Sequence, residues 1–135
     1  MIYTSSLKGV TSFRLRGFFA GWPNKPSPRP HLSLLKNCGH IRLAVDKRTD
    51  KAIGFITAIS DGVLCACIPL LEILPECRNQ GIGRELVKRM LQKLKGLYMI
   101  DLLCDPGLQP FYQRLGMAKA AAMMIRNYRC QSGRR

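Results

Sequence analysis

Residues 78–86 read Arg78-Asn79-Gln80-Gly81-Ile82-Gly83-Arg84-Glu85-Leu86. They lie between an apolar run that ends at Leu74 and a segment in which apolar residues recur every three to four positions. Gly81 and Gly83 have no side chains, so backbone N–H groups could approach a ligand, and the start of a helix would add positive potential. The stretch predicts either an anion-binding turn or a tight structural connection from a strand to a helix.

The segment after this turn is the clearest helix in the sequence. Its apolar residues fall on one stripe at helical spacing, and charged residues occupy the other positions. The stripe consists of Leu86, Val87, Met90, Leu91 and Leu94. Lys93 and Lys95 place positive charge at the C-terminal end, and Gly96 is a suitable cap. We therefore expect a helix that begins at Gly83 and ends before Gly96.

Two other phosphate-binding loops have signatures that this turn does not match. A P-loop requires Gly-Lys-Ser or Gly-Lys-Thr, whereas Arg84-Glu85 follows the second glycine here. A dinucleotide-binding turn requires a third glycine at position 86, which is Leu86. Both alternatives are disfavoured, so an anion site at this turn would be of another kind.

The periods of the apolar residues predict the remaining elements. We predict helices over residues 6–20, 31–36 and 110–115, and strands over residues 41–45, 53–59, 63–74, 98–104 and 121–128. Four prolines make residues 21–30 an irregular connection. Asp61-Gly62 predicts a two-residue type I′ hairpin, and the long apolar strand after it predicts burial on both faces with a bulge near Pro69. This order is typical of an α/β fold with a central antiparallel hairpin.

The net charge of the chain is strongly positive. It amounts to +14 at pH 7, from 22 Lys and Arg against 8 Asp and Glu in 135 residues. Such a surface attracts polyanions without reading their sequence. Nucleic acid, an acidic protein, anionic lipid and a phosphorylated cofactor are all compatible with it, and so is a basic surface without a dedicated partner.

Cysteine and hydropathy patterns limit the class of protein. The six cysteines form no C-x-x-C pair, which fits reduced thiols in a cytoplasm. His31 and His40 lie far from them and form no zinc-ligand pattern, so we expect no metal. No apolar run approaches the roughly 18 to 20 residues of a membrane span. We expect a single cytoplasmic domain.

Two motifs together resemble the GNAT acetyltransferase superfamily. Arg78-x-x-Gly81-x-Gly83 resembles its motif A, and Phe111-Tyr112 on a short helix ending at Gly116 is similar to its second hallmark. The resemblance covers residues 41–128. It implies an α/β fold with a mixed, largely antiparallel sheet, splayed at the centre and flanked by helices on both faces. Within one domain, 1–135, residues 1–40 would be variable acceptor-side helices, 41–128 the acetyl-CoA-binding core and 129–135 a basic tail.

The resemblance also implies how acetyl-CoA would bind. Backbone amides of residues 78–84 would hold the pyrophosphate, and the strand end at Ile73 and Leu74 would pair with the pantetheine arm between two diverging strands. Asp105 stands where the family often has a cofactor-contacting asparagine, and it adds negative charge near an anionic cofactor. The cofactor-binding residues so implied are Ile73, Leu74, Arg78, Asn79, Gln80, Gly81, Ile82, Gly83, Arg84, Asp105 and Tyr112.

Two residues are candidates for acid–base chemistry. Tyr112 matches the family's general acid, and a phenol with an ordinary pKa near 10 stays protonated at pH 7; the alternative is an aromatic side chain that packs the helix. Glu72 is an isolated carboxylate in an apolar strand, and burial would raise its pKa, as suits a base. A strand-end position or a salt bridge would explain Glu72 equally well, and Glu76, Asp101 and water are other candidate bases.

The resemblance implies an N-acetyltransferase that moves acetyl from acetyl-CoA to a primary amine of a small molecule or a protein. The alternative is a non-catalytic acyl-CoA-binding module, or a basic nucleic-acid- or ribosome-associated module, on the same fold. Trp22 and Phe18-Phe19 could line an acceptor pocket or pack the core, and Arg14 and Arg16 could meet an anionic acceptor or stay solvated.

The region after Gly116 departs from the family pattern. About 19 residues follow Gly116, where the family commonly places two strands. The chain would then have a single final strand or borrow one from a neighbouring copy, so a homodimer is one expectation.

Overall fold

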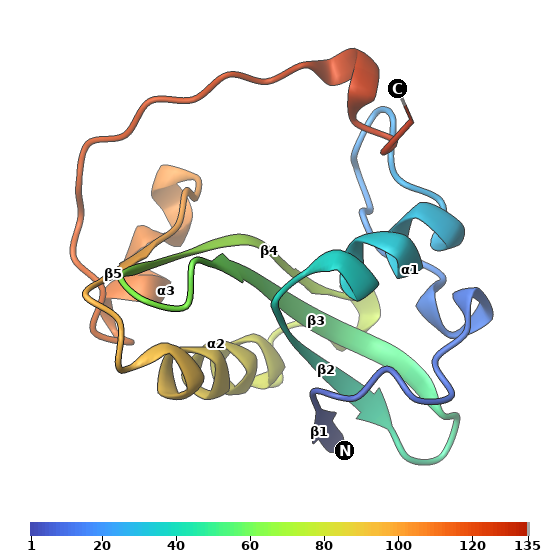
Figure 1. Cartoon of the computed structure of the whole chain (residues 1–135). Coiled ribbons are helices and arrows are strands. Elements are labelled where there is room, and N and C mark those ends of the chain that lie inside the picture. The colour runs from blue at the N-terminus through green and yellow to red at the C-terminus, as the bar shows by residue number, and fades with distance from the viewer. Residues whose placement is uncertain (135) are drawn as a thin grey trace.

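The computed structural model describes residues 1–134. Its strands are β1 (Ile2–Thr4), β2 (His40–Asp46), β3 (Lys51–Ser60), β4 (Cys65–Ile73) and β5 (Met99–Asp101). Its α-helices are α1 (Pro28–Asn37), α2 (Ile82–Leu94) and α3 (Gln109–Gln113), and 3-10 helices occupy Ser12–Leu15, Pro75–Cys77, Pro106–Leu108 and Tyr128–Cys130. The strands form one sheet in the order β1-β2-β3-β4-β5, antiparallel except for the parallel pair β4 and β5. Helices α1 and α2 lie on opposite faces of this sheet (Figure 1). The predicted α/β fold is confirmed.

Helix α2 packs closely on the sheet because β3 carries a glycine beneath it. The buried residues of α2 are Ile82, Leu86, Val87, Met90 and Leu94, which include most of the predicted stripe. A Cβ atom added to Gly54 would lie 2.7 Å from Ile73 Cδ1 and 3.1 Å from Leu86 Cδ1. These distances are shorter than normal contacts, so a larger residue at this position would require the side chains of Ile73 and Leu86 to shift.

An aromatic cluster fills the opposite face of the sheet, under α1. The ring centroid of His31 lies 4.4 Å from that of Phe55 and 4.9 Å from that of Phe19, and Phe18 completes the group. All four side chains are buried. Burial lowers the pKa of His31 to about 4, so the ring is neutral near pH 7. The cluster is therefore part of the hydrophobic core.

The predicted helix over residues 6–20 is wrong. Only Ser12–Leu15 form a single 3-10 turn. Gly9, Gly17 and Phe19 have φ values of 74°, 95° and 59°, and left-handed backbone at these positions is incompatible with a continuous helix. Helix α1 is longer than the predicted 31–36 and begins at Pro28. Proline is tolerated in a first helical turn because its N–H would lack a partner there.

The central hairpin is confirmed, but its predicted two-residue turn is wrong. One carboxylate oxygen of Asp61 accepts hydrogen bonds from the amides of Val63, Leu64 and Cys65, at 2.8, 2.8 and 3.1 Å. These bonds hold the pKa of Asp61 well below its usual range. Gly62 has a positive φ of 75° and Asp61 does not, so a longer loop organised by the carboxylate replaces the type I′ turn.

The predicted bulge near Pro69 is confirmed, whereas burial of β4 on both faces is not. Thr57 pairs with Leu70 and Ile59 pairs with Cys67, so one residue of β3 opposes two of β4. The side chains of Cys67 and Pro69 are exposed. One face of β4 is therefore exposed at these positions, although Cys67 is paired with Asp101 of β5.

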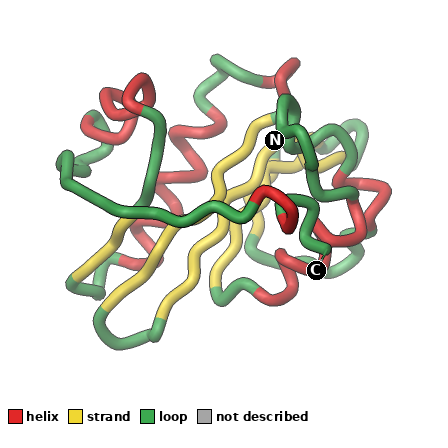
Figure 2. Tube along the Cα trace, turned by 90° about the horizontal axis from the view of Figure 1, so that it is seen from above, coloured by secondary structure: helices red, strands yellow, loops and turns green. Residues whose placement is uncertain are grey.

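The C-terminal part of the chain differs most from expectation. The predicted strand over residues 98–104 pairs only over Met99–Asp101, and the predicted strand over 121–128 is absent. Residues 118–127, here called the arm, have no regular secondary structure and cross over the sheet (Figures 1 and 2). Arg135, the last residue of the predicted basic tail, lies outside the described residues. Within residues 1–134, no helix has the length and apolar character that a bilayer span needs.

Candidate active site

The turn between β4 and α2 presents a row of backbone amides. After Leu74 and the 3-10 turn Pro75–Cys77, Asn79 and Gly81 adopt left-handed φ values of 60° and 79°. Gly81 is the N-cap of α2 and caps it with no side chain. Amides at a helix start have no acceptor within the helix. With this backbone conformation, the amides at the start of α2 are available to a ligand.

No residue among 1–134 accepts a hydrogen bond from the amides of residues 79–84. The turn is exposed around Gln80 and Gly81, and Arg78 and Arg84 flank it. The Nε atom of Arg78 donates to the carbonyl of Ile73 at 3.3 Å, which fixes its side chain beside the end of β4. Free amides, the positive end of the helix dipole and two cations suit an anionic ligand.

The sheet opens next to this amide turn. Strands β4 and β5 pair only from Cys65–Met99 to Cys67–Asp101. Beyond this point β4 continues to Ile73, where β3 is its only strand partner among the described residues, while the chain after β5 turns away as residues 102–105. The predicted splay between these two strands is therefore present, but β5 is the last strand of the described sheet, so the splay lies at the edge of that sheet and not at its centre.

One predicted cofactor residue already has a partner at the end of β4. The amide of Leu74 donates to the carbonyl of Ile53 at 2.9 Å, and its side chain is buried. The outward edge of the strand at this level belongs to Ile73. A ligand that lies along β4 would consequently meet the backbone of Ile73 more directly than that of Leu74.

Tyr112 lies on α3 and lines a cavity next to the end of β5. The cavity has a volume of about 400 Å³ and is called the Tyr112 cavity below. Tyr112 is 9% exposed, and its ring packs edge-on against Phe111 at 4.9 Å. Burial and, to a smaller extent, the nearby Cys104 raise the pKa of Tyr112 to about 12. The phenol is thus protonated throughout the neutral range and can act only as a proton donor there.

Glu72 lies on β4, directly opposite Phe55 of β3. Its side chain is half-buried. Burial raises the pKa of Glu72, while the Arg78 guanidinium and the backbone N–H of Phe19 act in the opposite direction. By contrast, Glu76 is exposed and faces Lys51 at 3.9 Å. Among these carboxylates Glu72 has the environment that best suits a general base.

The aromatic residues and arginines near the N-terminus do not form an open pocket. Phe18 and Phe19 lie in the buried aromatic cluster, and Trp22 packs on Phe19 with ring centroids 4.9 Å apart. Arg14 forms an ion pair with Asp50, and Arg16 lies 4.4 Å over the ring of Phe13. Of the two roles open for Phe18 and Phe19, core packing is the one observed.

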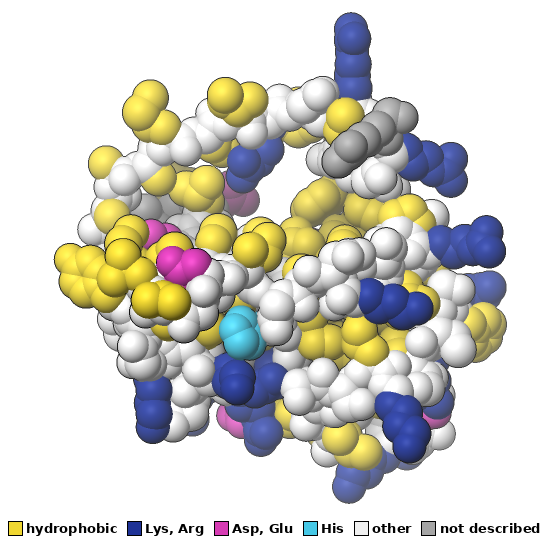
Figure 3. All heavy atoms as spheres, viewed as in Figure 1, with side chains coloured by type: hydrophobic (Ala, Val, Ile, Leu, Met, Phe, Trp, Pro, Cys, Tyr) yellow, Lys and Arg dark blue, Asp and Glu magenta, His cyan; other side chains and the backbone are white. Residues whose placement is uncertain are grey.

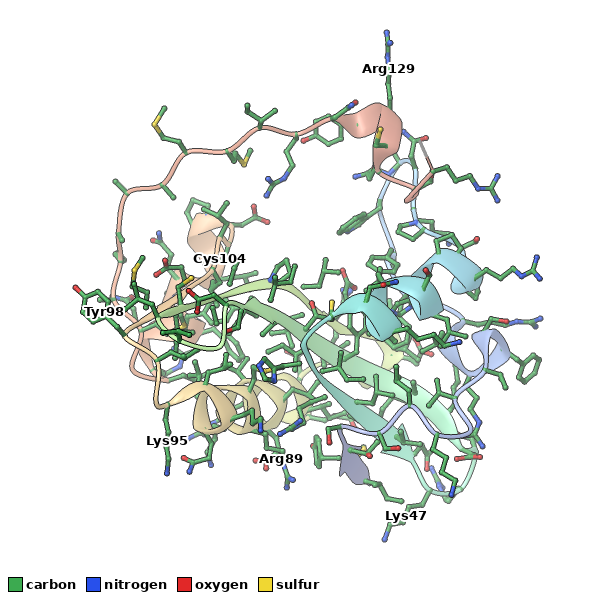
Figure 4. The ribbon with its side chains drawn as sticks, in the orientation of Figure 1. Lys47, Arg89, Lys95, Tyr98, Cys104 and Arg129 are labelled. Carbon is green, nitrogen blue, oxygen red and sulfur yellow. The ribbon has the colours of Figure 1, made fainter. Side chains whose placement is uncertain are left out.

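Sequence reasoning overlooked two cysteines. Cys67 of β4 and Cys104, which lies between β5 and α3, both line the Tyr112 cavity; Cys104 is labelled in Figure 4. Their apolar sequence context predicted packing, and only their position where β4 and β5 begin to diverge could have identified them as residues of the site. Asp105 follows on the surface, and its carbonyl accepts from the amide of Leu108 at 2.9 Å. In residues 1–134 no three potential ligands gather as a metal site would require.

Known proteins with similar sequences are N-acetyltransferases. The sequence model of the Acetyltransferase (GNAT) family matches residues 7–117. An uncharacterised ycf52-like N-acetyltransferase of Prochlorococcus marinus is 32% identical over 101 residues, which are 71% of this chain and 55% of that protein. The chloroplastic serotonin N-acetyltransferase 2 of rice is 33% identical over 70 residues, which are 50% of this chain and 35% of the rice protein. The chain thus spans about half, or less, of the length of these curated relatives.

Solved structures agree with the sequence matches. A proposed acetyltransferase of Deinococcus radiodurans R1 has a TM-score of 0.94 and 44% identity, and the match covers 97% of this chain and 91% of that one. Glucosamine-6-phosphate N-acetyltransferase of Arabidopsis thaliana, at 13% identity and a TM-score of 0.67 over 93% of this chain and 97% of that one, shares the fold. Since the family model covers most of the chain and both hallmark motifs lie at the opened sheet, this protein belongs to the GNAT acetyltransferase family.

Proposed function

We propose that the protein transfers the acetyl group of acetyl-CoA to a primary amine of a small molecule or a protein. One observation carries the proposal: the free amides of residues 79–84 lie at the start of α2, beside the gap that opens between β4 and β5. A pyrophosphate at these amides would direct an extended pantetheine along the unpaired edge of β4. The residues that would hold acetyl-CoA are those of the turn, together with Ile73 and Arg78.

The bound thioester supplies an activated acetyl group, and the protein must manage two protons. In the proposed mechanism the Tyr112 hydroxyl donates a proton to the departing sulfur, which suits its raised pKa. Glu72 accepts the proton that the acceptor ammonium must lose, directly or through a water molecule. Tyr112 lies on α3 and Glu72 on β4, and Glu72 is not among the residues that line the Tyr112 cavity.

We also propose that different parts of the chain bind the cofactor and the acceptor. Residues 41–128 form the acetyl-CoA-binding core, and residues 1–40 contribute the acceptor side. The rice relative acts on serotonin, an amine with an aromatic ring, and an arylalkylamine is one acceptor class to test here. All six cysteines are free, which supports a reducing compartment such as the cytoplasm.

A second candidate function is a basic binding module. Arg42, Lys88, Arg89 and Lys93 line one hollow, and Lys36 and His40 extend the same surface across Arg42 and Lys93. The only acidic residue in this group, Glu85, pairs with Arg89 at 2.6 Å. Arg89 and Lys95 point outward from α2 (Figure 4). This basic surface would suit nucleic acid.

The proposed activity can be tested with the purified chain, acetyl-CoA and panels of amines, peptides and ribosomal fractions. We expect thiol release that depends on both acetyl-CoA and an acceptor. In parallel, binding to a generic RNA is measured at 50 and 200 mM salt. Steeply salt-dependent RNA binding without thiol release for any acceptor would favour the basic module over the enzyme.

Replacing Glu72 by glutamine is expected to lower kcat/KM roughly 100-fold, because proton removal from the acceptor would lose its base. In the unmodified enzyme kcat/KM should rise with pH through the pKa of Glu72, which lies above its ordinary range. That rise should be absent in the variant, whereas the effect of acceptor deprotonation at higher pH should remain.

Glu76→Gln is the matched control, since Glu76 is an exposed carboxylate four residues away. If Glu76→Gln carried the loss of activity, Glu72 would not be the base. Stability provides a second check. A carboxyl group whose pKa is raised by folding destabilises the protein once pH exceeds that pKa, so Glu72→Gln should not lower Tm at pH 8.

A further inference from the structure

Phe19 has a backbone conformation that its residue type does not favour. Its φ is 59°, and within residues 1–134 the other non-glycine residues with a positive φ are Asp50 and Asn79. Asp and Asn tolerate left-handed backbone because their short polar side chains can form local hydrogen bonds, whereas a bulky side chain is strained there. Residues held in such a conformation cluster at functional sites. The strain at Phe19 therefore needs a cause in the packing or in the function.

Several contacts hold Phe19 in this conformation. Its side chain is 1% exposed, and its ring centroid lies 4.9 Å from those of both Trp22 and His31. Its carbonyl accepts a hydrogen bond from the amide of Trp22 at 3.2 Å. Two residues earlier, Gly17 lies so close to the end of β4 that an added Cβ would be 3.2 Å from Leu74 Cδ2. The backbone around Phe19 is thus fixed against the sheet next to β4.

The fixed backbone of Phe19 faces the proposed base. Glu72 lies directly opposite Phe55 in the sheet, so its side chain lies on the face that carries the aromatic cluster. There the N–H group of Phe19 donates a hydrogen bond to the Glu72 carboxylate and lowers its pKa, while burial, the larger effect, raises that pKa. Apolar side chains gather between α1 and the arm, on the same side of the sheet (Figure 3). Phe19 therefore offers the carboxylate a fixed donor in largely apolar surroundings.

The charged and titratable groups around Glu72 leave its orientation to this donor. The Arg78 guanidinium, from the turn after β4, lowers the pKa of Glu72 through its charge, but its Nε atom is bound to the carbonyl of Ile73. His31 of α1 is neutral near pH 7, because burial lowers its pKa to about 4. The arginines that precede Phe19 contact other side chains: Arg14 contacts Asp50, and Arg16 contacts Phe13.

We propose that Phe19 is a positioning residue for the acetyl transfer. Its left-handed backbone directs the N–H group at one oxygen of Glu72 and leaves the other oxygen to take the proton from the acceptor amine, directly or through water. This role rests on the proposed function, since the orientation of Glu72 affects the rate only if Glu72 is the base. The aromatic cluster, which belongs to the hydrophobic core, thereby acts on the reaction through the backbone of one of its members.

An NMR titration of the unmodified protein, without acetyl-CoA, tests the contact itself. The chain has three glutamates, Glu72, Glu76 and Glu85, so isotope labelling of the glutamate carboxyl groups gives three signals, and Glu72→Gln identifies the one from Glu72. We expect the amide proton of Phe19 to shift with the same pKa as the Glu72 carboxyl group, because the hydrogen bond strengthens when its acceptor ionises. In Glu72→Gln this shift should disappear.

A Phe19 amide proton that does not follow the titration of Glu72 would overturn the proposal. The measurement requires neither a core substitution nor catalysis. If the amide proton followed Glu72 while Glu72→Gln kept full activity, the contact would exist but the proposed base would be wrong. Failure of the positioning role and failure of the proposed function are therefore distinguishable.

The pH dependence of kcat/KM then tests whether the contact serves the reaction. A β-branched residue does not keep the left-handed backbone of position 19, so in Phe19→Ile the carboxylate of Glu72 should lose its donor. We expect the ascending limb of the profile to move to higher pH, because the ionised form of Glu72 is no longer stabilised by the hydrogen bond. Above that limb kcat/KM should fall roughly 10-fold, since the base is no longer held in place.

Phe18→Ile is the matched control. Phe18 is 4% exposed, its ring belongs to the same cluster, and its φ is not positive. Both isoleucine variants lose a buried ring next to His31, so both should lose stability, but only Phe19→Ile should move the limb. Glycine takes a positive φ without strain, so Phe19→Gly should keep the limb closer to its original position than Phe19→Ile does. Equal shifts at positions 18 and 19 would mean that Phe19 only packs the core.

Discussion

Replacing Gly81 by glutamate is expected to abolish measurable binding of acetyl-CoA. Gly81 has a φ of 79° and lies within the row of amides, residues 79–84, that have no acceptor in residues 1–134. A glutamate side chain would bring negative charge to the position proposed for the pyrophosphate, and it would strain the left-handed backbone. Losing two charge-assisted hydrogen bonds, at roughly 1.5 to 3 kcal/mol each, corresponds to at least a 100-fold rise in Kd.

Isothermal titration with acetyl-CoA measures this effect, and Gly62→Glu is a close control. Gly62 has a φ of 75°, and, as at Gly81, an added Cβ would meet no atom within 4 Å. The two variants therefore carry the same backbone strain and the same added charge, but only one has them at the amide turn. Unchanged affinity in Gly81→Glu, or equal losses in both variants, would contradict the assigned site.

Replacing Tyr112 by phenylalanine is expected to lower kcat by roughly 100-fold or more, the usual contribution of a general acid. The ring and its packing on Phe111 would remain, so acetyl-CoA affinity should change little. Because the pKa of Tyr112 is raised to about 12, deprotonation of the phenol should not limit the rate of the unmodified enzyme at any pH near neutrality.

Pre-steady-state thiol release separates the chemical step from product release for this variant. Tyr98→Phe is the control, since Tyr98 is 83% exposed and lies ahead of β5. A Tyr112→Phe enzyme with full turnover would mean that the phenol only packs α3. A rise in Kd that parallels the fall in kcat would assign Tyr112 to cofactor binding instead.

Much of the central fold follows from local patterns in the sequence. The stripe of α2, the hairpin and the bulge at Pro69 each depend on a period or on a residue with restricted backbone, and each is present. The turn at Gly81 could also be placed, because glycine spacing and helix onset coincide there. These features depend mainly on residues close in sequence, so the local sequence is sufficient to predict them.

The errors arose where distant contacts decide the structure. Residues 6–20 have apolar spacing that suits a helix, yet Phe18 and Phe19 turn inward to His31 and Phe55, and the backbone takes left-handed values to allow it. The apolar sequence of β4 predicted burial on both faces. Apolar residues also occur in strands at an open sheet edge, so the sequence alone does not distinguish the two environments. Residues 121–128 have strand composition, but a strand requires a neighbour, and no local pattern specifies one.

The missing side chain of Gly54 has a consequence for the proposed cofactor site. Ile73 and Ile82, which would touch a Cβ at this position, are the last residue of β4 and the first residue of α2. The amide turn connects these two residues, so the distance between α2 and the sheet and the conformation of the turn depend on each other. A larger residue at position 54 is therefore expected to displace Ile73 and Ile82, and with them the two ends of the proposed binding turn.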